Sequence, residues 1–237
     1  TDATLIGLGS MIGAGVFAAF TPAAQAAGSG LLVGLAVAAL VAFANATSSA
    51  QLAAVYPTSG GSYVYGRERL GHWWGFFAGW SFVIGKTASC AAMALTFAAY
   101  AAPAGWERPV AIVAVVALAT VNLFGVTRTA LLTRVIVVVV LVVLAVVVAA
   151  GASTGLQALA VTGSLVAGGW YGILQSAGLL FFAFAGYARI ATMGEEVRDP
   201  ARTIPLAITL ALSATVLIYA VIGVVVLGVL GPDGVAG

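Results

Sequence analysis

Long apolar segments recur along the chain, and several are long enough to cross a membrane as a helix. The segment 130–151 is rich in valine and carries a single charged residue, Arg134. A helix needs about 20 predominantly apolar residues to cross the hydrocarbon core of a bilayer. Charged residues make up only 7% of the sequence, whereas soluble domains carry about 25%. The sequence therefore predicts an all-α membrane protein that crosses the bilayer several times.

We predict seven membrane-spanning segments, most of them separated by residues that break helices. The second span, for example, ends at the proline- and glycine-containing stretch 57–61. The valine-rich runs do not argue for strands, because seven spans do not form a closed barrel of ordinary pattern. The predicted spans are residues 4–24, 31–55, 73–102, 109–125, 130–151, 169–193 and 204–230.

The basic residues predict the orientation of the chain in the membrane. Short cytoplasmic loops carry an excess of lysine and arginine. If the N-terminus is cytoplasmic, seven of the nine basic residues lie in or beside cytoplasmic loops. These seven are Arg67, Arg69, Arg128, Arg134, Arg189, Arg198 and Arg202. Arg108 alone lies on the outer side, and Lys86 lies within the third span. We therefore predict a multi-pass protein of the cytoplasmic (inner) membrane with its N-terminus in the cytoplasm.

Glycines interrupt two of the predicted spans. The first span contains Gly9, Gly13 and Gly15, and the sixth contains Gly186 among aromatic and small residues. Glycine leaves helical geometry readily. Non-helical backbone at membrane depth is tolerated only where protein buries it or where it lines a cavity. We therefore expect a cavity that holds a solute between the two interruptions, and a further kink in the first span at Pro22.

Two interrupted helices that lie five spans apart are typical of a five-plus-five inverted repeat. The first repeat would occupy about residues 1–155, and the second would begin in residues 156–237. Such a repeat needs about ten core helices, and only seven spans are predicted here. We therefore expect residues 1–237 to form one transmembrane transporter domain that belongs to a longer protein.

Four blocks of sequence resemble the amino acid–polyamine–organocation (APC) superfamily of transporters. The blocks are GSMIGAGVF at 9–17, YPTSGGSY at 56–63, FFAFAGY at 181–187 and GEEVRDPARTIP at 194–205. They occur in the order and with the spacing of that family. The resemblance implies a bacterial amino acid permease with a LeuT-like (APC) fold, in which helices 1 and 6 are discontinuous and this chain forms about the first seven transmembrane helices. It also implies secondary active transport by alternating access.

The resemblance further implies where an amino acid binds. Free amides at the start of a half-helix suit a carboxylate, and free carbonyls at an opposing break suit an ammonium. The residues implied for the carboxylate are Gly13, Ala14 and Gly15. Those implied for the ammonium, through their carbonyls, are Ile12, Phe182, Ala183 and Ala185. Those implied for the side-chain pocket or its gate are Phe184 and Tyr187, and Gly186 is a further implied substrate-binding residue. Close helix packing at small residues is the alternative interpretation of these glycines.

Lys86 is the most unusual single residue of the predicted spans. It lies 14 positions beyond His72, or about 21 Å along a helix, and a lysine at that depth costs about 2.5–3.5 kcal/mol on insertion scales. We predict that Lys86 couples transport to protons, the alternative being a structural cation bonded to helix-end carbonyls. Many APC members carry a lysine on the fifth helix, which the resemblance places near Val140 of this chain.

Glu195, Glu196 and Arg198 follow the sixth span. The resemblance implies that this segment contributes to the cytoplasmic gate, and a solvated loop is the alternative.

Several classes of function lack support in the sequence. Cys90 is the single cysteine, so no metal-type spacing exists. No P-loop and no basic patch suited to nucleic acid is present. We expect no enzymatic activity, cofactor or metal. The expected partners are an amino acid or amine, the lipid bilayer and protons.

The substrate and the mode of transport stay open at this point. The predicted spans offer no carboxylate to pair with a cationic side chain, which favours small neutral amino acids. A cationic amino acid or polyamine antiporter of the same family is the alternative, and proton coupling and exchange are both compatible with the sequence. A channel, or a seven-helix retinal protein with Lys86 as Schiff base, is the alternative from a different class, although a retinal protein lacks its counter-ion here.

Overall fold

The computed structural model describes residues 2–124, 126–153, 166 and 168–237, and all regular structure in this part of the chain is helical. The helices are α1 (Asp2–Met11), α2 (Ala14–Ala18), α3 (Phe20–Ala27), the short 3₁₀ helix η1 (Gly28–Gly30), α4 (Leu31–Val55), α5 (Ser62–Leu70), α6 (His72–Ala101), α7 (Glu107–Leu123), α8 (Val126–Ser153), α9 (Gly169–Phe184), α10 (Tyr187–Ala191) and α11 (Pro200–Ala236). The predicted all-α class is confirmed.

Four helical stretches of the described chain are long and apolar enough to cross a membrane. They are Phe20–Val55, His72–Ala101, Leu131–Ser153 and Pro200–Ala236. The multi-pass membrane character is therefore confirmed, whereas the count of seven spans stays a prediction. The predicted end of the fourth span at residue 125 and the predicted boundary between repeats at 155–156 lie outside the described residues.

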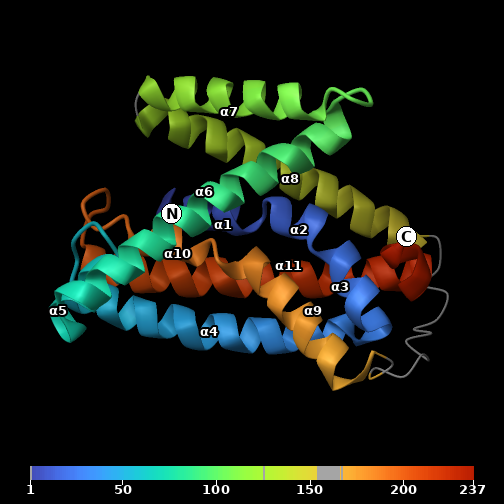
Figure 1. Cartoon of the computed structure of the whole chain (residues 1–237), viewed down its shortest axis with the longest axis horizontal. Helices are drawn as coiled ribbons and strands as arrows, with labels where there is room; N and C mark the ends of the chain where they lie inside the picture. The colour runs from blue at the N-terminus through green and yellow to red at the C-terminus, as the bar shows by residue number, and fades with distance from the viewer. Residues whose placement is uncertain (1, 125, 154–165, 167) are drawn as a thin grey trace.

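A core of closely packed helices contains α1–α4 and α9–α11 (Figure 1). Alanines spaced four residues apart put a smooth, buried face on α4, which packs against α9 and α11. Side chains four residues apart lie on one face of a helix, and small side chains allow two helix backbones to approach closely. The alanines of this face are Ala38, Ala42, Ala46 and Ala50.

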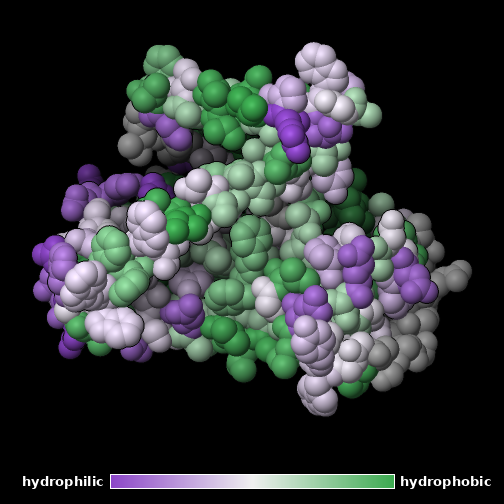
Figure 2. Space-filling view, in the orientation of Figure 1, coloured by the Kyte–Doolittle hydropathy of each residue, from purple (hydrophilic) through white to green (hydrophobic). Residues whose placement is uncertain are grey.

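The helices α6 and α7 lie outside this core, and α8 reaches it through the buried Val137 and Leu144. In Figure 1, α7 runs along the edge of the molecule opposite α4, and α6 and α8 run diagonally between the two edges. Only Gly75 and Ala98 of α6 are buried, and large side chains such as Trp80 are exposed. Figure 2 shows hydrophobic side chains spread over α6 and α7, and hydrophilic ones gathered at the end of the molecule where α5 lies. Exposed apolar helices of this kind are suited to a lipid environment.

One local expectation needs correction. The residues between the second and third predicted spans, with Arg67 and Arg69, were expected to form a cytoplasmic loop, but they contain the helix α5. Tyr65 of α5 is buried, whereas side chains such as Arg67 and Arg69 are exposed. Because one residue of α5 is buried among charged ones, the sequence of this segment shows no apolar pattern that would predict a helix.

The first span is also interrupted beside Pro22, because α2 ends at Ala18 and α3 begins at Phe20. Pro22 lies in the first turn of α3, where a missing N–H is tolerated.

Candidate functional site

The first predicted interruption lies at Ile12 and Gly13, between α1 and α2. Gly13 leaves helical geometry with φ −128° and ψ −135°, and its amide donates to the carbonyl of Met11 at 2.9 Å. Regular bonding resumes when the amide of Val16 donates to the carbonyl of Gly13 at 3.3 Å. In the described residues, no backbone carbonyl accepts a bond from the amide of Gly15. The start of α2 therefore offers an amide without a helical partner.

The second predicted interruption lies at Ala185 and Gly186, between α9 and α10. The amide of Ala185 donates to the carbonyl of Phe182, and the amide of Ala188 donates to the carbonyl of Ala185, both at 3.3 Å. These i→i+3 bonds form a tight turn in place of the longer α-helical bonds. The predicted ammonium-binding carbonyls of Phe182 and Ala185 thus each accept one bond already, and each keeps a second lone pair.

The two interruptions are in direct contact. A Cβ atom on Gly186 would overlap the carbonyl of Ser10 at the end of α1. A Cβ atom on Gly15 would lie 2.5 Å from the Cβ of Ala183 in α9. Gly13 differs from both, because the nearest atom to a Cβ there is the carbonyl oxygen of Gly9 at 3.9 Å. Helix packing therefore requires glycine at 15 and 186, and leaves room for a side chain at 13.

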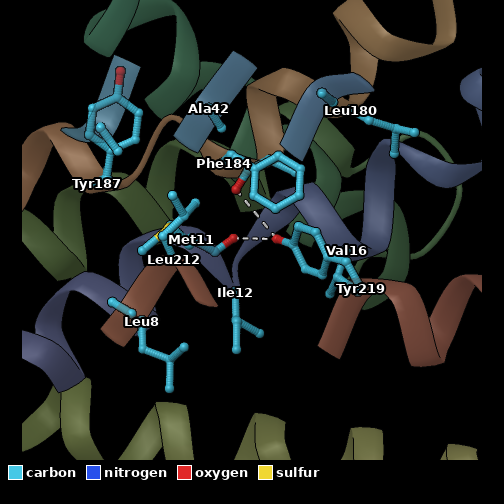
Figure 3. Close-up of a cluster of buried hydrophobic side chains, with 14 of the residues drawn as sticks. Leu8, Met11, Ile12, Val16, Ala42, Leu180, Phe184, Tyr187, Leu212 and Tyr219 are labelled. Carbon is cyan, nitrogen blue, oxygen red and sulfur yellow. Dashed lines mark hydrogen bonds between the residues drawn. The ribbon is translucent and has the colours of Figure 1, made fainter. Parts of the chain in front are cut away.

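Tyr219 of α11 joins the two interruptions (Figure 3). Its hydroxyl donates to the carbonyl of Met11 at 2.5 Å and lies 3.4 Å from the carbonyl of Ala183. These carbonyls belong to the last turns of α1 and α9. The ring of Tyr219 is fully buried and packs against Phe184 with 5.3 Å between ring centroids.

Sequence reasoning missed Tyr219. A signal was present, because a buried tyrosine in an apolar span needs a hydrogen-bond partner for its hydroxyl.

A cavity of about 670 Å³ lies beside the contact between the interruptions. Residues of α1, α2, α6, α9 and α10 line it, together with Thr133 of α8. The predicted site residues that reach its wall are Gly13, Gly15, Lys86, Phe182, Ala183, Ala185, Gly186 and Glu196. Two further hollows, of about 450 Å³ between α6 and α7 and about 600 Å³ among α4, α5 and α6, involve neither interruption.

The other predicted site residues lie elsewhere. Phe184 and Tyr187 are buried in the hydrophobic core, so Phe182 rather than Phe184 presents an aromatic ring to the cavity. Ile12 is also part of that core. Glu195 and Arg198 are exposed and do not line the cavity. Nothing is described for the side chain of Ala14 or for that of Arg128.

Three charged side chains line the cavity. Lys86 is half-buried, and its Nζ lies 5.7 Å from the centroid of the Phe82 ring. Arg189, which the sequence placed with the cytoplasmic loops, reaches the same wall from α10. Its Nη2 lies 3.7 Å from Oε1 of Glu196, and its Nη1 lies 3.4 Å from the hydroxyl of Thr192. Across the described residues, no cluster of three potential metal ligands exists.

The segment that contains Glu195 and Glu196 packs on the turn between α4 and α5. A Cβ atom on Gly194 would lie 2.7 Å from the carbonyl carbon of Thr58 and 2.9 Å from that of Pro57. Two of the blocks that carry the family resemblance, 56–63 and 194–205, are thus neighbours in the structure. Glu196 is the residue of these two blocks that lines the cavity.

Comparison with known proteins is consistent with this arrangement. The sequence model described as amino acid permease matches residues 1–237. An uncharacterized transporter of Mycobacterium tuberculosis (strain ATCC 25618 / H37Rv) is 63% identical over 235 residues, which cover 99% of this chain and 53% of that protein.

More distant relatives carry substrate names. The branched-chain amino acid permease BcaP of Bacillus subtilis (strain 168) is 26% identical over 97% of this chain and 54% of its own length. Cationic amino acid transporter 5 of Arabidopsis thaliana is 27% identical over 92% of this chain and 41% of its own length. The chain thus spans about half the length of these curated relatives.

Proposed function

Because this chain belongs to the amino acid permease family, we propose that it carries the amino acid site of a secondary active transporter that works by alternating access. The observation that carries the proposal is the cavity of about 670 Å³ whose wall includes both helix interruptions. Non-helical backbone at membrane depth is typical of solute sites in transporters. The proposed site is formed by backbone groups as well as by side chains.

The backbone at the cavity has groups for both ends of an amino acid. The amide of Gly15, with no backbone acceptor among the described residues, suits the α-carboxylate. The carbonyls of Phe182, Ala183 and Ala185 suit the α-ammonium through their second lone pairs. Phe182 presents its ring to the same cavity. We assign the substrate's α-carbon to the part of the cavity that Gly13 and Gly186 line.

Tyr219 makes the two interruptions depend on each other. Its hydroxyl contacts one carbonyl from each interrupted helix, so movement of either segment changes a hydrogen bond of the other. Alternating access requires a change of contacts around a fixed site. Tyr219 is the residue through which we expect the two half-helices to move together.

Lys86 is the proposed coupling residue, because it is the ionisable side chain that α6 presents to the cavity. A change in its protonation changes the charge beside a bound solute. Proton-coupled transport and exchange both follow from such an arrangement. Glu196 is the proposed gate residue, since its ion pair with Arg189 lies at the cavity.

The names of relatives leave the substrate class open, because they include branched-chain and cationic amino acids. We place the protein in the cytoplasmic membrane with its N-terminus inside, on the distribution of basic residues.

Counterflow in proteoliposomes tests the proposal. The full-length protein is reconstituted with an unlabelled amino acid inside, and a trace of the labelled amino acid is added outside. A carrier accumulates the label transiently above its outside concentration, and this accumulation should respond to a proton gradient but not to sodium. Passive equilibration without overshoot, for every amino acid and polyamine of a broad panel, contradicts the proposal and favours a channel.

A further inference from the structure

The charged side chains at the cavity are mostly positive. Lys86, Arg189 and Glu196 are the ionisable residues of its described wall. Arg189 has Glu196 as its partner, with 3.7 Å between Nη2 and Oε1. Lys86 has no carboxylate partner among the described residues. The wall therefore carries one positive charge in excess, and Lys86 provides it.

The surroundings of Lys86 do not compensate its charge. Lys86 lies in the middle of α6 and is half-buried, and its Nζ lies 5.7 Å from the centroid of the Phe82 ring. An aromatic ring offers a quadrupole and no net charge. An ammonium in a partly enclosed apolar wall attracts an anion more strongly than it would in water, because the effective dielectric constant is lower.

The neutral polar side chains of the wall are compatible with an anion. They are Ser10, Ser81, Ser89 and Thr133, each with a hydroxyl. The hydroxyl of Ser10 donates to the carbonyl of Ile6 at 2.9 Å. A hydroxyl can rotate to donate to a carboxylate oxygen. Glu196 contributes the one carboxylate of the described wall, and Arg189 already pairs with it.

From this charge balance we propose that the transported amino acid carries a carboxylate on its side chain, as aspartate and glutamate do, and that Lys86 binds this second carboxylate. The inference rests on the proposed transport function of the same cavity and names its substrate class. A cationic side chain would place a second ammonium beside Lys86, which repels it. A neutral side chain would leave Lys86 without a counter-ion. The inference therefore names acidic amino acids as the substrate class, whereas the sequence alone favoured small neutral ones.

The test compares each acid with its neutral isostere. The full-length protein in proteoliposomes is given aspartate or asparagine, glutamate or glutamine, and ornithine as the cation. The amide keeps the size of the acid and a carbonyl oxygen that can accept from Lys86, but it carries no negative charge. We expect kcat/KM for the acid to exceed that for its amide by about ten- to a hundredfold, the factor that a charge-assisted hydrogen bond contributes.

Variants of Lys86 show whether this residue causes the preference for a substrate with an acidic side chain. Lys86→Met removes the charge at similar length and should abolish the preference for the acid, so that the ratio of kcat/KM for acid and amide falls to about one whatever the absolute rate. Lys86→Arg keeps the charge and should keep the preference. Arg108→Met is the matched control, because Arg108 lies at the hollow between α6 and α7, away from this cavity. This variant should prefer the acid over the amide as strongly as the native protein does. Thermal stabilisation of the native protein by each acid and amide gives the same comparison without any variant.

The outcomes separate this inference from the proposed function. Equal or better transport of the amides by the native protein, or an unchanged preference in Lys86→Met, overturns the inference and leaves amino acid transport in place. Failure to accumulate any amino acid, whether acidic, neutral or cationic, contradicts the proposed function and the inference with it.

Discussion

The hydroxyl of Tyr219 donates to the carbonyl of Met11, a residue 208 positions earlier, at 2.5 Å. The same hydroxyl lies 3.4 Å from the carbonyl of Ala183. One side chain of α11 thereby contacts the carbonyl ends of α1 and α9, immediately before the backbone of each leaves the α-helix. The geometry of the two interruptions therefore depends on three helices, α1, α9 and α11.

Tyr219→Phe removes the hydroxyl and keeps the ring. The carbonyl of Met11 retains the bond from the amide of Gly13, so the free energy of unfolding should fall by only about 0.5–1.5 kcal/mol, while transport should fall much further because the interruptions are no longer linked. Thermal unfolding in detergent and counterflow measure the two effects. Tyr171→Phe is the control, since Tyr171 is 82% exposed. Full transport by Tyr219→Phe would show that the link has no role.

Gly186→Ala and Gly15→Ala should both destabilise the protein. The added methyl group would meet the backbone of Ser10 in the first variant and Ala183 in the second, and overpacking of this kind costs about 1–3 kcal/mol. Gly13→Ala is the matched control, because it meets nothing nearer than 3.9 Å. It should fold normally but raise KM, because the methyl group narrows the cavity. A Gly186→Ala variant as stable as Gly13→Ala would contradict the contact between the interruptions.

Glu196→Gln should leave stability nearly unchanged and alter transport. Its ion pair with Arg189 is 3.7 Å long, and the two side chains are 48% and 36% exposed, so solvent screening reduces its contribution to about 0–1 kcal/mol. The proposed gate contact is lost all the same, which should change the rate of counterflow. Glu195→Gln serves as the control, because Glu195 is exposed and does not line the cavity. Identical rates in the two variants would remove Glu196 from the gate.

Tyr65→Phe should leave stability unchanged or raise it, in contrast to Tyr219→Phe. The hydroxyl of Tyr65 is buried and has no hydrogen-bond partner in the described part of the chain, and such a group carries a desolvation cost of about 1–3 kcal/mol. Burial also raises the pKa of Tyr65. A raised folded pKa means that native stability is complete below the unfolded pKa of about 10 and falls as pH rises above it. Unfolding measured from pH 8 to pH 11 should show a smaller alkaline loss in Tyr65→Phe, and an equal loss would locate the titration elsewhere.

Lys86→Met should uncouple transport from protons. Lys86 is the ionisable residue that α6 presents to the cavity, so its removal deprives the site of a group that exchanges a proton within the span. Uptake under an inward proton gradient should fall to the rate seen without a gradient, and the dependence on external pH should flatten. A variant with the native rate and pH profile would show that coupling resides in another group.

The sequence predicted the helices and the two interruptions because both depend on local chemistry. Apolar runs specify membrane helices, and Gly13 and Gly186 stand where the backbone leaves the α-helix. Its failures involve contacts between distant residues. In the sequence, Tyr219 resembles the other aromatic residues of the apolar spans. Its hydrogen bond with Met11 depends on the fold.

Arg189 and Phe184 show the same limit at finer scale. The sequence placed Arg189 at the end of the sixth span, beside a cytoplasmic loop, and gave no sign that it lines the cavity, where the turn at Ala185 and Gly186 places it. Phe184 and Phe182 are two residues apart, and helical rotation decides that Phe182 faces the cavity while Phe184 packs on Tyr219. The seven-residue block 181–187 contains four aromatic residues, and this pattern does not specify the rotation.

The most direct test of the account is a density map of the full-length protein with its transported amino acid bound. We predict density for the amino acid in the cavity lined by Gly13 and Gly186, with its α-carboxylate within hydrogen-bond distance of the amide of Gly15. An amino acid bound instead in the hollow between α6 and α7, or among α4, α5 and α6, with the cavity beside the interruptions empty, would contradict the account.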